Sequence, residues 1–193
     1  MLHSSAVPAL ENQPEQLSRV SRITRSVRES RGAARIFLVV AAIAFWLGGF
    51  TFYAGVAIPM GVEVLGGHRT VGFITERVTN WLNVAGVVAL VIFAWNIWIG
   101  WRAGGKVLRR TLLITLIVMT LIEIELIWLH PIMDRLLVTQ PPRDILDEDK
   151  FDLLHHVYLI STTVQWCFGM IHVWCICVMW HKLRSPAPEQ SVA

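Results

Sequence analysis

Four long runs of apolar residues, each with few charged side chains, constrain this chain more than any other feature of its sequence. They cover residues 36–58, 83–101, 111–133 and 153–180. A helix of about 20 apolar residues is long enough to cross the roughly 30 Å hydrocarbon core of a bilayer. The whole chain has only 16% charged residues, against about a quarter in soluble domains. The sequence therefore predicts an all-α, polytopic membrane protein with a bundle of four transmembrane helices.

The basic residues are unevenly distributed between the connections. The segment before the first run carries six arginines, and the connection between the second and third runs carries four Lys or Arg residues. The other two connections carry five basic residues among eight acidic ones. Because short basic loops stay in the cytoplasm, we predict that both termini are cytoplasmic and that the protein resides in the plasma membrane. The expected organisation is a basic cytoplasmic segment over residues 1–34, a transmembrane domain over 35–182 and a cytoplasmic tail over 183–193.

Residues 12–32, before the first run, have the pattern of a basic amphipathic helix. Pro14 suits the first turn of such a helix, and Gly32 is expected to end it. Arginines form one face, and apolar residues at helical spacing form the other: Leu17, Val20, Ile23 and Val27. A helix of this kind can lie in the membrane interface, where anionic lipid headgroups attract it. The alternative is a solvated basic tail that only fixes the orientation of the chain.

The first run contains small residues on one helix face, among them Gly48 and Gly55. In a bilayer, small residues let neighbouring helices approach closely, so we expect these glycines to pack against another helix. Tyr53 lies off this face, and its hydroxyl group is expected either to donate a hydrogen bond to an acidic site or to mark the membrane interface. Pro59 and Gly61 are expected to bend or end the helix.

Two carboxylates and an imidazole interrupt the third run, in the stretch LIEIELIWLHP over residues 121–131. A carboxylate near the bilayer midplane costs at least about 2.5–3.5 kcal/mol, so such residues usually face the interior of a bundle. Glu123 and His130 share one helix face, whereas Glu125 points about 160° away from Glu123. We therefore predict a proton or ligand site at Glu123 and His130, with Glu125 nearer to the headgroups. The alternative for Glu123 is a protonated carboxyl group that only links helices.

The fourth run supplies candidate partners at its start, in the stretch KFDLLHHVYL. His155 and His156 are expected at the level that His130 reaches on the antiparallel third helix, and Asp152 lies one turn before them. Adjacent histidines point about 100° apart, so at most one of the two is expected to face the bundle. Three interpretations stay open: a zinc, copper(II) or iron site at His130, His155 and His156, a proton or ligand site, and interfacial histidines that only start the helix. A deeper polar stripe is expected to join helices by hydrogen bonds: Tyr158, Ser161, Gln165 and His172.

Three stretches together resemble a known family: FWLGGFTFYAGVAIP in the first run, GFITERVTNWLN leading into the second, and FDLLHHVYL at the head of the fourth. They are similar to the four-helix membrane family of unknown function related to transmembrane protein 205, over residues 36–180. The first run is also similar to the copper-resistance D family, which usually has more spans. The resemblance implies a four-helix membrane fold and supplies no catalytic residues.

The sequence contains no nucleophile with a neighbouring base, no phosphate-binding glycine loop and no cofactor fingerprint, so an enzyme is not expected. The leading hypothesis is a small transport or binding protein that handles protons or a cation at the buried Glu/His site. The alternatives are a structural or assembly protein without a ligand, and a haem-binding protein with axial histidines from two helices. No cofactor is required, although a divalent metal or haem stays open. Expected partners are the lipid bilayer, its anionic headgroups and a second copy of the chain, and nothing points to nucleic acid.

Overall fold

The computed structural model describes residues 13–101, 105–138 and 144–184. Within them, four helical segments are long and apolar enough to cross a membrane: Ser21–Leu65, Thr70–Gly100, Lys106–Asp134 and Glu148–Lys182. The prediction of an all-α protein with four apolar helices packed together is therefore confirmed. The chain divides into two compact units, residues 1–38 and 39–193, which are described separately.

The first unit contains most of helix α1, which spans Gln13–Ile43. The basic segment is helical, as predicted, but the prediction that Gly32 ends it is wrong, because α1 continues through this residue. A single glycine costs only about 1 kcal/mol relative to alanine in a helix interior, and the residues that follow are mostly apolar helix formers. The side chains of Ile23 and Val27 are exposed, so the described unit leaves these two apolar positions uncovered.

The second unit begins inside the first apolar helix, which changes its winding twice. After α1 come a π-helical segment η1 (Ala44–Gly48), α2 (Gly49–Phe52), a second π-helical segment η2 (Tyr53–Ala57) and α3 (Ile58–Leu65). Pro59 was expected to bend or end the helix, but the helix passes it with a widened turn in which the amide of Ile58 donates to the Tyr53 carbonyl. π-helical turns are rare; they occur mostly as single-turn bulges inside α-helices and are frequent at functional sites. The helix ends only at Gly66, whose φ of 75° is readily adopted by glycine.

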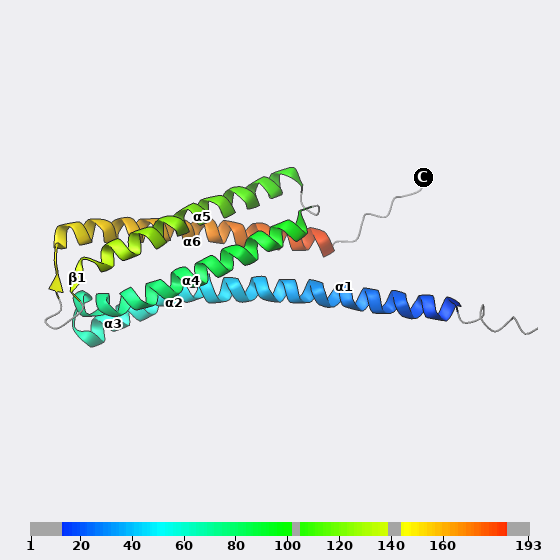
Figure 1. Cartoon of the computed structure of the whole chain (residues 1–193), viewed down its shortest axis with the longest axis horizontal. Helices are drawn as coiled ribbons and strands as arrows, with labels where there is room; N and C mark the ends of the chain where they lie inside the picture. The colour runs from blue at the N-terminus through cyan, green and yellow to red at the C-terminus, as the bar shows by residue number, and fades with distance from the viewer. Residues whose placement is uncertain (1–12, 102–104, 139–143, 185–193) are drawn as a thin grey trace, which may run out of the picture. The chain divides into compact units, whose positions relative to one another are not determined.

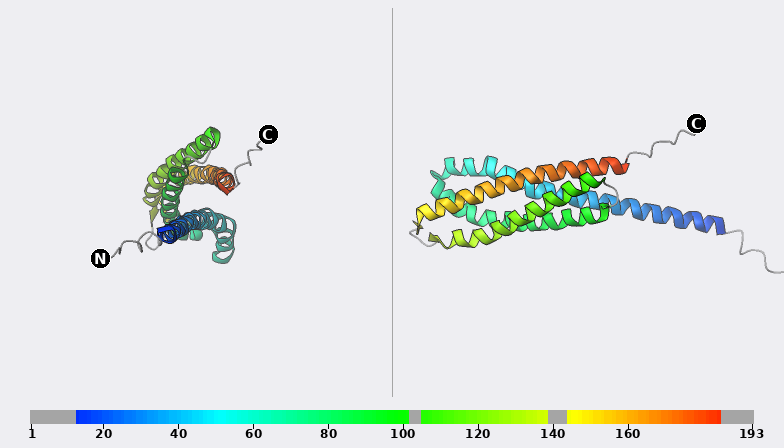
Figure 2. Two further views of the ribbon diagram at one scale, coloured as in Figure 1. Left: turned by 90° about the vertical axis from the view of Figure 1, so that its right-hand side faces the viewer. Right: turned by 90° about the horizontal axis from the view of Figure 1, so that it is seen from above.

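Three further helices complete the second unit, and each extends beyond the apolar run that predicted it. They are α4 (His68–Gly100), α5 (Lys106–Asp134) and α6 (Glu148–Arg184). The added turns are polar, so hydropathy alone missed them. At the start of α4 they include Glu76, Thr79 and Asn80, which the sequence analysis had left outside the second span. Helix α5 packs against both α4 and α6, and its contact with α6 is the more extensive (Figures 1 and 2).

A short antiparallel hairpin lies between α5 and α6. Its strands are β1 (Leu137–Val138) and β2 (Asp144–Ile145), and Leu137 pairs with Ile145. This hairpin, the start of α6 and the turn from α3 to α4 lie at one end of the bundle. We call this end the hairpin end. Two hydrophobic clusters fill the unit: a large one that includes Phe93, Met119 and Ile176, and a small one nearer the hairpin that comprises Leu126, Leu129 and Tyr158.

The glycines that permit close contacts are not the predicted ones. A Cβ atom added at Gly48 or Gly55 would meet no atom within 4 Å, so neither glycine packs against another of the described helices. At Gly169 of α6, in contrast, a Cβ atom would lie 2.9 Å from a methyl carbon of Leu47. The indole of Trp166 also donates a hydrogen bond of 3.0 Å to Thr51. The first helix of this unit therefore meets α6 through the face of Leu47 and Thr51.

Candidate polar site in the helix bundle

Glu123 occupies the buried face of α5. This face is a stripe of residues three or four positions apart: Leu112, Thr115, Met119, Glu123, Leu126 and Leu129. Glu123 is only 2% exposed, and along the helix it lies between Met119 of the large hydrophobic cluster and Leu126 of the small one. The sequence therefore placed this carboxyl group correctly in the interior of the bundle.

The carboxyl group of Glu123 has a hydrogen-bond partner on one side only. The side-chain amide of Gln165 on α6 donates to Oε2 at 2.6 Å and also to the backbone carbonyl of Met119 at 3.2 Å. Oε1 is fully buried, and no residue in the described part of the chain donates to it. Half of the acceptor capacity of this carboxyl group is thus unmet.

The backbone of α4 forms the third wall around Glu123. A Cβ atom added at Gly86 would lie 2.6 Å from Oε2 and 2.9 Å from Oε1, which is closer than real Cβ atoms approach. The carboxyl group therefore lies directly on the glycine backbone, and any side chain at position 86 would displace it. Three helices thus enclose this carboxyl group: α5 carries it, α6 supplies the side-chain amide of Gln165, and α4 supplies the backbone at Gly86.

A second polar group lies on the other side of Glu123 from the hairpin, around His172 of α6. Its Nδ1 atom and Oγ1 of Thr115 on α5 lie 2.6 Å apart in a hydrogen bond, and its ring stacks on Phe93 of α4 at 5.0 Å between centroids. His172 is 0% exposed, and Nε2 has no hydrogen-bond partner among the described residues. Asn96, one turn from Phe93, is also 0% exposed. Neither its side-chain nitrogen nor its side-chain oxygen has a hydrogen-bond partner among the described residues. Each of these orphaned groups is costly in a bundle interior unless a proton, water or ion meets it.

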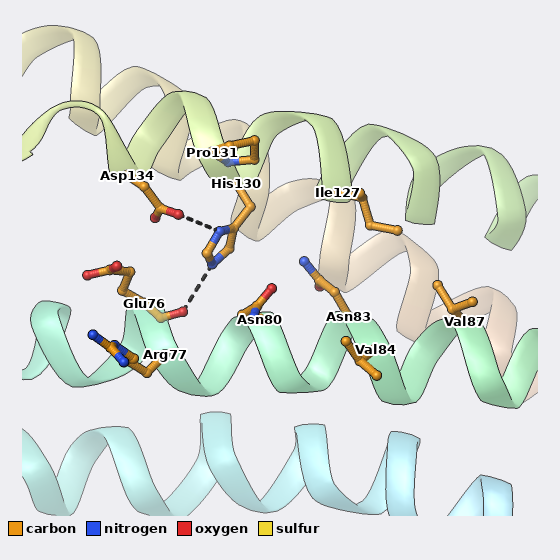
Figure 3. Close-up of a pocket in the computed structure, with 10 residues that line it drawn as sticks. All are labelled: Glu76, Arg77, Asn80, Asn83, Val84, Val87, Ile127, His130, Pro131 and Asp134. Carbon is orange, nitrogen blue, oxygen red and sulfur yellow. Dashed lines mark hydrogen bonds and ion pairs between the residues drawn. The ribbon is translucent and has the colours of Figure 1, made fainter.

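His130 does not pair with Glu123, although both lie on one face of α5. Nδ1 of His130 lies 2.9 Å from Oδ2 of Asp134, and Nε2 lies 3.0 Å from the carbonyl oxygen of Glu76 and 3.1 Å from Oγ1 of Thr79 (Figure 3). The partners of Glu123 are on α6, whereas those of His130 are on α4 and on the next turn of α5. The predicted two-residue site is therefore two separate sites.

The hydrogen on the His130 ring can sit on either nitrogen. If Nδ1 carries it, this nitrogen donates to Asp134, and Nε2 accepts from the hydroxyl group of Thr79. If Nε2 carries it, this nitrogen donates to the Glu76 carbonyl, and the contact between Nδ1 and Asp134 then needs a second proton. In either form, His130 connects Asp134 of α5 to α4.

Two pockets open at the hairpin end, and they share His130, Asp134 and Glu76. One, of about 560 Å³, lies between α4 and α5 and is called here the α4–α5 pocket (Figure 3). The other, of about 640 Å³, lies among the first helix, α4, α5, the hairpin and α6 and is called the hairpin pocket. Asn83 lines the first and Tyr158 the second, and the hydroxyl group of Tyr158 donates to Asn83 at 3.0 Å. A hydrogen bond thus connects the walls of the two pockets, one turn of α4 away from Gly86.

The remaining predicted residues separate into two groups. His155 and Asp152 line the hairpin pocket together with His130, so imidazoles from α5 and α6 do reach one cavity. His156 is exposed, its Nδ1 lies 2.7 Å from the Asp152 carbonyl, and it does not line that pocket. Glu125 is exposed and accepts a hydrogen bond of 3.0 Å from Ser161. The buried oxygen of Tyr53 has no partner among the described residues, so the hydrogen bond expected from it to an acidic side chain is not formed.

The metal and haem interpretations gain no support from these positions. In the described ranges, no three His, Cys, Asp or Glu residues lie close enough to hold a metal ion. The suggested set of His130, His155 and His156 is not brought together, because His130 contacts Asp134 and His156 does not line the pocket that His130 and His155 share. Both ring nitrogens of His130 already contact oxygen atoms, which leaves neither free for axial haem ligation.

Three residues of the polar site were not predicted in this role. Gln165 was expected only to join helices by hydrogen bonds, and neither Thr115 nor Gly86 stands out in the sequence. The seven-residue spacing of Tyr158, Gln165 and His172 was a usable signal, because it places all three on the buried face of α6. Nothing in the sequence marks Gly86, since its role depends on which side chain of α5 lies against it.

No family model matches this sequence, and no curated protein and no solved structure matches it either. The likeness to the family related to transmembrane protein 205 therefore stays a hypothesis. What is established is a multi-pass, four-helix membrane protein with buried polar contacts at Glu123 and His172.

Proposed function

We propose that this chain is a small membrane transport protein in which Glu123 binds and releases a proton or a cation. The observation that carries the proposal is the unequal environment of its two carboxyl oxygens. Oε2 accepts from Gln165 at 2.6 Å, while Oε1 is buried without a donor in the described structure. An ionised carboxylate with one hydrogen bond is expensive inside a bundle. A proton on the carboxyl group, or a cation beside Oε1, removes that cost.

A transport role also needs a route to the buried carboxyl group. The α4–α5 pocket supports one from the hairpin end, because Asn83 and Val87, which lie on either side of Gly86 along α4, both line it. The paired side chains of His130 and Asp134 lie in the wall of the same pocket. On the other side of Glu123, the unpartnered atoms of His172 and Asn96 offer the next polar positions. The proposed path is thus a row of polar groups along α4, α5 and α6, with Glu123 at its centre.

The orientation and the lipid partners are part of the proposal. We infer from the basic residues that the hairpin end faces away from the cytoplasm in the plasma membrane, with both termini inside. We also infer that the basic part of α1 binds anionic headgroups, because its apolar residues Ile23 and Val27 are exposed beside arginines.

The transport proposal is tested with full-length protein in liposomes that contain a pH-sensitive dye. A potassium gradient with valinomycin supplies the driving potential, and proton or monovalent cation flux is followed. Glu123→Gln should reduce the flux to that of protein-free vesicles, because the amide keeps the shape of the side chain but cannot exchange a proton. Glu125→Gln is the matched control and should keep the wild-type flux, since Glu125 is exposed and bound to Ser161.

A second measurement separates transport from a structural role. Infrared difference spectra between two pH values should contain a carboxylic C=O band that Glu123→Gln removes and Glu125→Gln retains. The rival structural function is supported by three side-chain bridges between helices, at Gln165, Thr115 and Tyr158. If wild-type vesicles conduct no more than empty ones and the infrared band is missing, the structural role is correct.

A further inference from the structure

We propose that the hairpin pocket is a binding site for an amphipathic organic cation, that is, a positively charged nitrogen or phosphorus centre carrying aromatic or alkyl groups. Glu123 does not line this pocket, so the proposal goes beyond ion exchange at that residue. If Glu123 drives transport, the pocket is a natural substrate site, but cation binding there does not depend on it.

The size and walls of the pocket suit a molecule rather than a bare ion. Its volume of about 640 Å³ falls within the range of roughly 300–1,000 Å³ typical of small-molecule sites. Most of its wall is apolar, and side chains from the first helix, α4, α5, the hairpin and α6 all contribute. Among the described residues no metal-binding group of three His, Cys, Asp or Glu exists, which argues against a divalent metal as the occupant.

Acidic side chains outnumber basic ones in the pocket wall. Four carboxyl groups and two imidazoles line it, and no lysine or arginine is among its lining residues; the acids are Glu76, Asp134, Glu148 and Asp152. The imidazole of His130 lies 2.9 Å from Asp134, so a proton on this ring offsets only that acid. The carboxyl groups therefore favour a cationic occupant over a neutral or anionic one of equal size.

Aromatic side chains add a second feature that favours an organic cation. Five aromatic residues line the pocket: Phe50, Tyr53, Phe73, Phe151 and Tyr158. On α6, the rings of Phe151 and His155 lie nearly parallel, 5.9 Å apart at 7°. Aromatic faces attract cations through the ring quadrupole, and combined with carboxylates they are the usual recognition surface for quaternary ammonium groups.

The test measures equilibrium binding of radiolabelled tetraphenylphosphonium to full-length protein in detergent, with empty micelles subtracted. Unlabelled benzyltrimethylammonium should compete for the site. Neopentylbenzene, its uncharged carbon analogue, should compete at least about tenfold more weakly. A charge pair or cation–π contact of about 1.4 kcal/mol corresponds to a tenfold difference in affinity. This comparison uses the wild-type chain and does not depend on any variant folding. Equal competition by the two compounds would reduce the site to a hydrophobic cavity and overturn the proposal.

Variants then locate the binding site. The double variant Glu76→Gln/Asp152→Asn should weaken tetraphenylphosphonium binding by about tenfold or more. Glu63→Gln is the matched control, because Glu63 is an exposed acid of α3 that does not line the pocket. Unchanged binding by the double variant, or the absence of saturable binding to the wild type, would refute the site.

Glu123→Gln separates this proposal from the transport proposal. It should bind tetraphenylphosphonium like the wild type, because residue 123 is not in the pocket wall. Normal tetraphenylphosphonium binding together with no flux in the wild type or any variant would support the pocket proposal and reject the transport proposal. Flux that depends on Glu123 without saturable tetraphenylphosphonium binding would support transport and reject the pocket proposal.

Discussion

Glu123 of α5 and Gln165 of α6 form a 2.6 Å hydrogen bond in which a single amide serves both the carboxyl group and the backbone carbonyl of Met119. This contact fixes the rotation of α6 against α5 at the boundary between the two hydrophobic clusters. It also leaves one oxygen of Glu123 without a donor in the described part of the chain. The bundle is thus held together at the same residue on which the proposed ion exchange depends.

The Gln165 contact gives the first prediction. Gln165→Leu should lower the free energy of unfolding by about 1–3 kcal/mol, because it leaves the Glu123 carboxyl group and the Met119 carbonyl without their donor. Unfolding is followed by circular dichroism in mixed micelles with increasing dodecyl sulfate. Thr163→Val on the exposed face of α6 is the control and should stay within about 0.5 kcal/mol of wild type. Equal stability of both variants would show that the amide contributes nothing.

Gly86 gives the second prediction. Gly86→Ala should destabilise the bundle by about 1–3 kcal/mol, because its Cβ atom would lie 2.6 Å from Oε2 of Glu123. Gly72→Ala in the same helix meets nothing within 4 Å and should be neutral or slightly stabilising. Combining Gly86→Ala with Glu123→Ala should cost less than the sum of the two single changes, since the clash is then absent. Strict additivity in this double-mutant cycle would contradict the close approach.

The third prediction concerns the second polar group. Thr115→Val should destabilise the protein by about 1–2 kcal/mol, because Nδ1 of the fully buried His172 loses its 2.6 Å partner. Thr120→Val is the matched control, since the Thr120 hydroxyl group bonds to the Leu116 carbonyl of its own helix. The same unfolding assay compares the two, and a larger loss in Thr120→Val would show that the His172 contact is not structural.

The fourth prediction concerns topology. A reporter that is active only in the cytoplasm should work when it is fused after Ala193 and should be silent when it is inserted near Asp147 in the hairpin segment. The asymmetry of Lys and Arg supports this result. Activity of the reporter at Asp147 would reverse the proposed orientation and place the hairpin pocket on the cytoplasmic side.

The fifth prediction concerns the basic segment of α1. A peptide of residues 12–32 should become helical on anionic vesicles and should dissociate as the salt concentration rises, because screening weakens the attraction between arginines and headgroups. Neutral vesicles provide the control. Helix formation that is equal on both kinds of vesicle would indicate hydrophobic binding without headgroup recognition.

The sequence by itself determined the number of membrane-spanning helices and the face of α5 on which Glu123 lies. Both follow from local properties of the chain: the apolar length needed to cross a bilayer and the 3.6-residue period of the helix. The same period separated Glu123 from Glu125, and the structure places the first in the core and the second at an exposed position. The local prediction was wrong at Gly32, where the flanking turns continue the helix. At Pro59, where a bend or an end was predicted, the helix widens into a π turn and ends at Gly66.

Only the tertiary structure decided which residues meet. The choice of Gln165 rather than His130 as the partner of Glu123 depends on the rotation and axial register of α6 against α5, which no single helix encodes. The same holds for Gly86, whose role depends on the Glu123 side chain that lies against it. It holds also for Gly48 and Gly55, where an added Cβ atom would meet none of the described residues within 4 Å. The hairpin pocket combines acids and aromatic rings from distant segments, and their convergence is set by packing between helices. Packing of this kind is a sum over many weak, shape-dependent contacts, so it is decided by the whole bundle and not by any stretch of sequence.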